Sequence, residues 1–195
     1  MPRIEAVQPY ARGMGWVTRE SETKYENAWI RVREDRVTGP TGGDGIYGVV
    51  TMQHPAVFVV ALDDEDRVCL VTIDRYTVGT STEIPAGGSD GEDPLAAAKR
   101  ELREETGFEA GDWTPLGTMN ALNGIAEAVE HVFLARDLRP VADADSAQTQ
   151  AEEGIEAISW VPLEIVLSLI SDGTITDGET IAAIAKAGIL LGRFR

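Results

Sequence analysis

The sequence predicts an α+β fold in which a mixed β-sheet lies between helices. Strand-like and helix-like segments follow one another in the order strands, helix, strands and helices, which is typical of a mixed sheet covered by helices. The segment 29–37 alternates between apolar and polar residues, whereas the helical segment near residue 100 repeats its apolar residues at helical spacing. Gly and Pro residues mark the turns between segments.

The strands before the central helix can be placed in order. The first about 25 residues show no periodicity and are expected to be irregular. Strands are expected at 29–37, 46–53, 56–62 and 68–76. The Gly-rich stretch 40–45 is expected to form a turn, and the acidic stretch 63–66 is expected to form a hairpin loop.

The central helix is indicated at both ends. Asp93 can cap its N-terminus, Pro94 fits the first helical position, and Gly107 can take the left-handed conformation that ends a helix. The helix would pack on the core through a stripe of Leu95, Ala98 and Leu102.

The second half of the chain returns to strands and ends in helices. Strands are expected at 113–122, 128–134 and 155–161, with a polar loop at 137–150. Helices are expected at 162–170 and 179–191, separated by the breakers Ser171-Asp172-Gly173 and Asp177-Gly178.

Composition excludes several classes of partner. The chain has 17 Lys and Arg residues against 33 Asp and Glu residues, a net charge of −16 that repels nucleic acid and anionic membranes. Its single cysteine, Cys69, cannot form a disulfide within the chain, which fits a reducing cytoplasm. The first residues lack the apolar core of a signal peptide, and no apolar run is long enough to span a membrane. We therefore expect a cytoplasmic protein that binds neither nucleic acid nor membranes.

Three carboxylates of the central helix share one face. Glu101, Glu104 and Glu105 stand at positions i, i+3 and i+4. The like charges of Glu101 and Glu105 cost about 0.2–0.5 kcal/mol without a cation between them. Clustered hard oxygen ligands suit Mg²⁺ or Mn²⁺. The alternative is an ordinary solvated helix face, in which Lys99 and Arg103 pair with the acids, and spacing alone favours the metal site by a small margin.

The segment around these acids resembles the Nudix box, G-x5-E-x7-R-E-U-x-E-E-x-G-U, where U is a bulky apolar residue. Every defined position from Glu92 onward matches: Arg100, Glu101, Leu102, Glu104, Glu105, Gly107 and Phe108. The loop before the box departs from the motif, since four residues rather than five separate Gly87 from Glu92 and Ala86 stands where the strict spacing places glycine. Weaker similarity to ADP-ribose and nucleotide-sugar pyrophosphatases extends over 70–76, 83–88, 152–156, 160–163 and 172–177.

This resemblance implies a Nudix-type α/β/α sandwich with a mixed β-sheet and an N-terminal β extension. Residues 1–45 would form the extension, a dimerisation element, and residues 46–195 the Nudix hydrolase domain. The implied activity is Mg²⁺-dependent (or Mn²⁺-dependent) hydrolysis of the pyrophosphate bond of ADP-ribose or a related nucleoside diphosphate sugar. The products would be a nucleoside monophosphate and a sugar phosphate. Two alternatives stay open: a house-cleaning pyrophosphohydrolase of nucleoside triphosphates, and a non-catalytic ligand sensor of Nudix fold.

The resemblance also implies roles for single residues. The metal ligands would be Glu101, Glu104, Glu105 and the carbonyl of Ala86. Water activation needs a base, and Glu152 and Glu153 of the late acidic loop are equal candidates, followed by Glu104.

The remaining roles concern arginines and substrate contacts. Arg100 would act in catalysis by holding Glu104 or Glu92 in place, since its five donors can fork onto two acids. Substrate contacts are expected from Arg75, Glu83 and Gly87. In a homodimer, Arg31 or Arg33 would reach the substrate of the neighbouring subunit.

Overall fold

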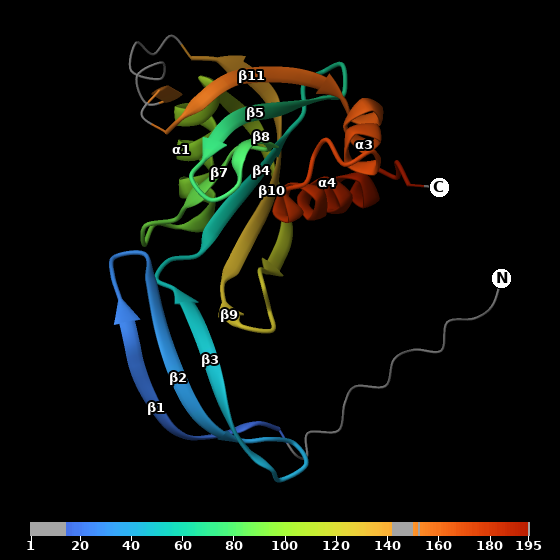
Figure 1. The fold of residues 1–195 in the computed structure, drawn as a ribbon. Helices are drawn as coiled ribbons and strands as arrows, with labels where there is room; N and C mark the ends of the chain where they lie inside the picture. The colour runs from blue at the N-terminus through green and yellow to red at the C-terminus, as the bar shows by residue number, and fades with distance from the viewer. Residues whose placement is uncertain (1–14, 142–149, 152, 195) are drawn as a thin grey trace, which may run out of the picture.

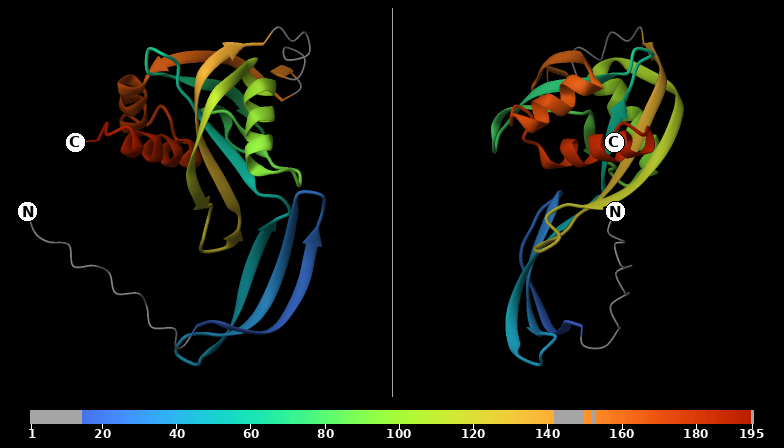
Figure 2. Two further views of the ribbon diagram at one scale, coloured as in Figure 1. Left: turned by 180° about the vertical axis from the view of Figure 1, so that it is seen from behind. Right: turned by 90° about the vertical axis from the view of Figure 1, so that its right-hand side faces the viewer.

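The computed structural model describes residues 15–141, 150–151 and 153–194 (Figure 1). Its strands form three sheets. The N-terminal sheet has the order β1-β2-β3-β9, the central sheet β7-β4-β10-β8, and the third sheet β11-β5-β6. Helix α1 lies on one side of the central strands, and helices α3 and α4 lie on the other (Figures 1 and 2). The described helices are too short or too polar to cross a membrane.

The N-terminal sheet projects from the rest of the molecule (Figures 1 and 2). It contains β1 (Val17–Glu26), β2 (Ile30–Thr38), β3 (Asp44–Met52) and the short β9 (Ala126–Glu127). The expectation that the first 25 residues are irregular is wrong for β1. All ten residues of β1 are exposed, so neither face selects apolar side chains, and the strand is held by its antiparallel pairing with β2.

The central sheet separates two apolar cores. It contains β4 (Ala56–Ala61), β7 (Ala86–Gly88), β8 (Phe108–Asn120) and β10 (Val129–Pro140). Val57 and Val59 of β4 pack in the core beneath α1 (Pro94–Thr106), whereas Val60 packs in the core with α3 (Leu163–Ser171) and α4 (Gly178–Leu190). Successive residues of a strand point to opposite faces, so β4 holds both helix layers. Strand β10 runs parallel to β4 and antiparallel to β8. The predicted mixed sheet between helices is confirmed.

The third sheet contains β5 (Arg67–Arg75), β6 (Gly79–Glu83) and β11 (Ile155–Pro162). Strands β6 and β7 were not expected from the sequence, because their residues are small, polar or glycine. Strand β10 runs on to Pro140, into the stretch 137–150 that was expected to be a loop. It is extended because it pairs with β8 along its whole length, with Pro140 opposite Phe108. The rest of that predicted loop, residues 142–149, lies outside the described residues.

The predicted caps of α1 are confirmed. The Asp93 carboxylate accepts hydrogen bonds from the N–H groups of Leu95 and Ala96, at 3.0 and 3.2 Å. Gly107 takes the left-handed conformation with φ of 72° and donates its N–H to the Arg103 carbonyl. These two ends fix which residues of α1 face the sheet. The division of the chain between residues 45 and 46 stays a prediction; strand β3 runs across it and belongs to the N-terminal sheet.

Candidate active site

Two glutamates of α1 are buried against the edge strand β7. The exposed fraction of Glu101 is 5% and that of Glu105 is 2%. Glu104 is half-buried, on the same side of the helix. Glu153, from the segment that leads into β11, joins them: Glu101, Glu104 and Glu153 each offer a carboxylate oxygen, and the three oxygens lie within 4.8 Å of one another. One small cation can reach all three.

Arg100 forms hydrogen bonds with these glutamates and with the neighbouring backbone. Its Nη1 donates to Glu101 Oε1 at 2.8 Å and to Glu104 Oε2 at 3.0 Å. Its Nε donates to Glu92 Oε2 at 3.3 Å, and its Nη2 donates to the Gly88 carbonyl at 2.9 Å. The single guanidinium therefore holds three carboxylates and the β7 backbone in one arrangement.

Strand β7 approaches the glutamates very closely. A Cβ atom on Gly87 would lie 2.3 Å from the carboxylate of Glu101, so any other residue there would displace that carboxylate. The neighbouring Ala86 donates its N–H to Glu105 Oε2 at 2.9 Å. Although the loop is one residue shorter than in the motif, its backbone still contacts the carboxylates of the helix.

Burial and mutual repulsion make these carboxylates hard to ionise without a cation. Burial raises the pKa of Glu105 to about 9, with smaller contributions from the charges of Glu101 and Glu153. Burial likewise raises the pKa of Glu101 to about 7, although Arg100 opposes the shift. The pKa of Glu153 is also raised, by burial and by the charge of Glu104. A divalent cation bound among them would replace the protons and remove the repulsion.

Arg75 and Glu83 form an ion pair beside the glutamates. Arg75 Nε donates to Glu83 Oε1 at 3.2 Å, and Nη2 donates to Oε2 at 2.6 Å. Both line a hollow of about 360 Å³ that also contacts Ala86 and Gly87. The structure therefore brings Arg75, Glu83 and Gly87, the expected substrate contacts, to one cavity next to the acidic group of α1.

Three acids of this hollow were missed by the sequence analysis: Glu130, Asp177 and Glu179. Of these three, Glu130 could have been found from the alternating pattern of β10. Glu130 stands two and four residues before Val132 and Leu134, which are buried in the core with α3 and α4. Period-two spacing places Glu130 on that same inward face, an unusual position for an acid.

The arginines of β2 occupy a different part of the fold. Arg33 forms a bidentate pair with Glu127 of β9, at 2.8 and 2.6 Å, and donates to Asp35 at 3.1 Å. Arg31 has a buried Nε without a hydrogen-bond partner among the described residues. Within the described chain, no hydrogen bond joins either arginine to the glutamates of α1. Glu152, one of the two expected bases, lies outside the described residues.

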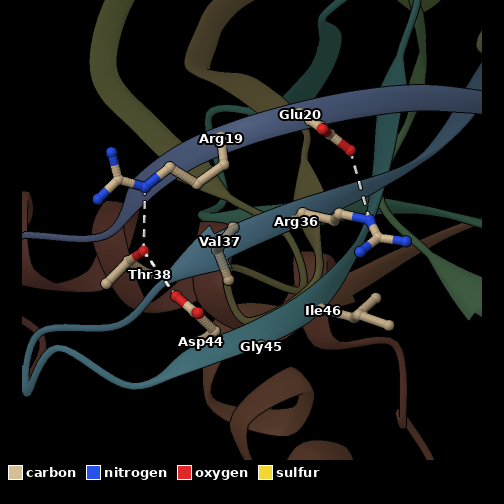
Figure 3. A pocket seen from close by; sticks show the side chains of 8 residues that line it. All are labelled: Arg19, Glu20, Arg36, Val37, Thr38, Asp44, Gly45 and Ile46. Carbon is tan, nitrogen blue, oxygen red and sulfur yellow. Dashed lines mark hydrogen bonds and ion pairs between the residues drawn. The ribbon is translucent and has the colours of Figure 1, made fainter.

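A more voluminous hollow, of about 600 Å³, lies on the N-terminal sheet (Figure 3). Its charged side chains are occupied with one another. Arg36 pairs with Glu20 at 3.4 Å, and Arg19 Nε donates to Thr38 Oγ1 at 3.0 Å. The Thr38 hydroxyl in turn donates to Asp44 at 3.0 Å. This hollow lacks the convergent acids seen at α1, so size does not identify the site.

Comparison with known proteins identifies two family models that match this chain. A model described as NUDIX domain matches residues 52–184, and a model described as nucleoside diphosphate sugar hydrolase N-terminal domain matches residues 16–50. An ADP-ribose pyrophosphatase of Mycobacterium tuberculosis is 33% identical over 177 residues, which is 89% of this chain and 81% of the relative. An ADP-ribose pyrophosphatase of Bacillus subtilis is 35% identical over 136 residues, 68% of this chain and 72% of the relative.

A solved structure titled "Crystal structure of ADP compounds hydrolase" superimposes with a TM-score of 0.78. It is 21% identical and covers 95% of this chain and 99% of its own. This likeness supports the fold.

Proposed function

The chain belongs to the NUDIX domain family, and from that premise we propose that it hydrolyses the pyrophosphate bond of ADP-ribose or a related nucleoside diphosphate sugar. One observation carries the proposal. The carboxylates of Glu101, Glu104 and Glu153 converge within reach of one cation, directly beside Gly87 and the hollow that contains Arg75. A pyrophosphate needs such positive charge, because the chain as a whole is strongly acidic.

We propose Mg²⁺ as the cation, with Mn²⁺ as a substitute. The donor set fits, because all its members are hard carboxylate oxygens. Glu101 and Glu104 of the converging group would hold the cation, together with Glu105 and the carbonyl of Ala86, the further ligands that the family resemblance implies. When bound, such an ion neutralises phosphate charge and lowers the pKa of a bound water.

The protein's own groups complete the chemistry. Arg100 keeps Glu101 and Glu104 at fixed separation, so the site does not have to reorganise during the reaction. Glu153 would accept the proton of the attacking water, a role that suits a carboxyl whose pKa is raised. Arg75 would hold a phosphate, because its Nη1 has no hydrogen-bond acceptor among the described residues while Glu83 fixes the other two nitrogens.

Two observations bear on the alternative functions. The match of residues 16–50 to the N-terminal domain of nucleoside diphosphate sugar hydrolases favours a sugar substrate over a nucleoside triphosphate. The box keeps all of its acids, which disfavours a sensor without catalysis.

We further propose a homodimer that works in the cytoplasm. The N-terminal sheet exposes large apolar side chains, with Trp16, Tyr25 and Trp29 at 60%, 55% and 71%, and a two-fold partner is the commonest way to cover such a surface. Arg31 would reach the partner's substrate, since Arg33 is already engaged by Glu127. The buried, unpaired Cys69 fits a reducing compartment. Light scattering tests the assembly; a mass near the 21.0 kDa of one chain would reject the dimer.

The activity is tested with a panel of nucleoside diphosphate derivatives, with Mg²⁺ and with EDTA, and with product masses recorded. We expect Mg²⁺-dependent conversion of ADP-ribose to AMP and ribose phosphate. Release of pyrophosphate from nucleoside triphosphates alone would instead favour the house-cleaning reaction, and binding without turnover would favour the sensor.

A further inference from the structure

A second group of acids lines the hollow on the other side of Gly87 from the carboxylate of Glu101. Its members come from three elements that are distant in sequence. Glu83 lies at the end of β6, Glu130 lies in β10, and Asp177 and Glu179 lie at the start of α4. The cation in this part of the wall is Arg75.

Glu130 is the acid that requires an explanation. Its exposed fraction is 6%, and its side chain lines the hollow without a hydrogen bond or an ion pair to any described residue. The charged groups that act on it are Glu179 and Asp177, which repel it. Its carboxylate oxygens are not among the fully enclosed side-chain atoms without a partner, so they reach the hollow, and a ligand bound there can supply the hydrogen bonds that the described residues do not.

The spacing of these acids does not suit a metal ion. Among the described residues, the three carboxylates that converge within 4.8 Å are those of Glu101, Glu104 and Glu153, and no such trio forms in this hollow. Two of the four acids already have partners. Glu83 is paired with Arg75, and Asp177 caps α4 by accepting the N–H of Thr180 at 2.7 Å. Glu130 remains as an acceptor without a partner among the described residues, and Glu179, which interacts with its own backbone N–H and with Asp177, lines the same hollow.

We propose that this hollow is a sugar subsite, in which hydroxyl groups of a substrate sugar ring donate hydrogen bonds to Glu130 and Glu179. The inference rests on the proposed function. The hollow shares Ala86 and Gly87 with the acidic site of α1, and Arg75 stands at its edge. The group attached directly to either phosphate of a nucleoside diphosphate sugar is a sugar, so it is the first group that enters a cavity next to the pyrophosphate.

Size and lining agree with a sugar ring. The volume of about 360 Å³ is at the small end of the range for ligand pockets. Phe58 is the aromatic side chain of the described lining, and it packs against the core with α3 and α4, so the hollow lacks a ring free to stack on a base. The carboxyl oxygens of Glu130 and Glu179 can accept hydrogen bonds from the hydroxyl groups of a sugar ring.

The test compares three substrates that carry the same pyrophosphate. They are ADP-ribose, the β-methyl ester of ADP, which lacks the distal sugar, and ADP-ribose whose adenosine is 2′,3′-dideoxy. The variants are Glu130→Met and Glu179→Gln. Glu164→Gln is the matched control for the second, because Glu164 is an exposed first-turn glutamate of α3 outside the hollow. We would measure kcat/KM with Mg²⁺, and binding by calorimetry in EDTA, where hydrolysis is not required.

We expect Glu130→Met to lower kcat/KM and affinity for ADP-ribose by about 10- to 100-fold, the loss typical of hydrogen bonds to a charged acceptor. For the truncated compound that lacks the bound sugar hydroxyls, the loss should be less than about 2-fold, because the wild-type protein cannot form that hydrogen bond with it either. If it shrinks on the methyl ester, the hollow holds the distal sugar; if it shrinks on the dideoxy compound, it holds the nucleoside ribose.

An equal loss on all three compounds, or no loss while the wild-type protein hydrolyses ADP-ribose, would overturn the sugar subsite and leave the proposed function standing. A wild-type protein that binds these compounds without hydrolysing them would overturn the proposed function, and the calorimetric comparison would still decide the subsite. If Glu164→Gln lowered kcat/KM and affinity as much as Glu179→Gln does, the effect would come from the loss of one negative charge alone. That result would likewise overturn the assignment of Glu179 to the sugar subsite.

Discussion

The two acidic groups beside Gly87 differ in how their carboxylates are spaced and braced. On α1, Glu101 and Glu104 are held by one guanidinium, and with Glu153 they converge within 4.8 Å. Across Gly87, Glu130 and Glu179 face a cavity of about 360 Å³, and Glu130 has no partner among the described residues. Each group contains one buried acid, Glu101 in the first and Glu130 in the second, beside acids that are more exposed.

The difference shows that acidity alone does not define a ligand. Converging carboxylates repel one another until a small cation joins them, so their geometry selects an ion. Separated carboxylates around a cavity can each accept a hydrogen bond, so their geometry selects a larger molecule with several donors. We therefore expect the α1 group to bind a cation and the group across Gly87 to bind a larger ligand.

The largest effect is expected at the converging group. Glu101→Gln should lower kcat by about 1,000-fold, because a cation typically contributes several kcal/mol of charge stabilisation to the transition state. The fold should survive, since the amide keeps the shape of the side chain. Steady-state rates at saturating Mg²⁺ check this, with Glu164→Gln as a control. Unchanged turnover would remove Glu101 from the ligand set.

Glu153→Gln should come next, with a loss in kcat of about 100-fold, the low end of the effect of a general base. Its affinity for Mn²⁺ should fall much less than its rate. Glu156→Gln, an exposed position of β11 three residues away, is the matched control and should keep its activity. Retention of nearly full rate by Glu153→Gln would move the base to Glu152 or Glu104.

Gly87→Ala should weaken Mn²⁺ binding and activity by about 10-fold, the low end of the effect of disturbing a metal site from outside its ligands. The added methyl group would lie 2.3 Å from the Glu101 carboxylate and displace it. Gly124→Ala is the control, because nothing lies within 4 Å of its added Cβ. Equal behaviour of the two variants would mean that β7 does not position Glu101.

The smallest effect is expected in stability. Burial raises the pKa of Glu130 to about 7, above the 4.5 of a free carboxyl, with further contributions from Glu179 and Asp177. The folded state then binds more protons than the unfolded state between these values, so Glu130 makes folding less favourable as pH rises from about 4.5 to about 7. Arg75, Glu83 and, in the adjoining hollow, His54 are the other titratable groups at these cavities.

Glu130→Gln should therefore melt a few degrees higher than the wild-type protein at pH 8, with a difference that shrinks towards pH 5. Thermal unfolding at several pH values, in EDTA, measures this. A constant difference at all pH values would show that Glu130 does not titrate in this range, and its carboxylate would then be ionised and partnered.

The acids of the α1 site could be predicted from the sequence, whereas most acids of the cavity beside it could not. The helix ends follow from Asp93, Pro94 and Gly107, and helical spacing then places the acids on one face. The long strands follow from alternating burial. Strand β1 could not be found in this way, because it has no buried face. The second acidic group depends on tertiary packing, since Glu83, Glu130 and Glu179 come from three elements and only the period of β10 hinted at one of them.

A cation is expected to bind on the α1 side of Gly87 and not in the cavity across it. Electron paramagnetic resonance of Mn²⁺ tests this directly in the substrate-free protein. Glu101→Gln should weaken Mn²⁺ binding by at least about 10-fold, whereas Glu130→Gln should leave its affinity and the number of bound ions unchanged. Loss of an ion in Glu130→Gln, or undiminished binding in Glu101→Gln, would show that the cation does not bind at the α1 carboxylates alone.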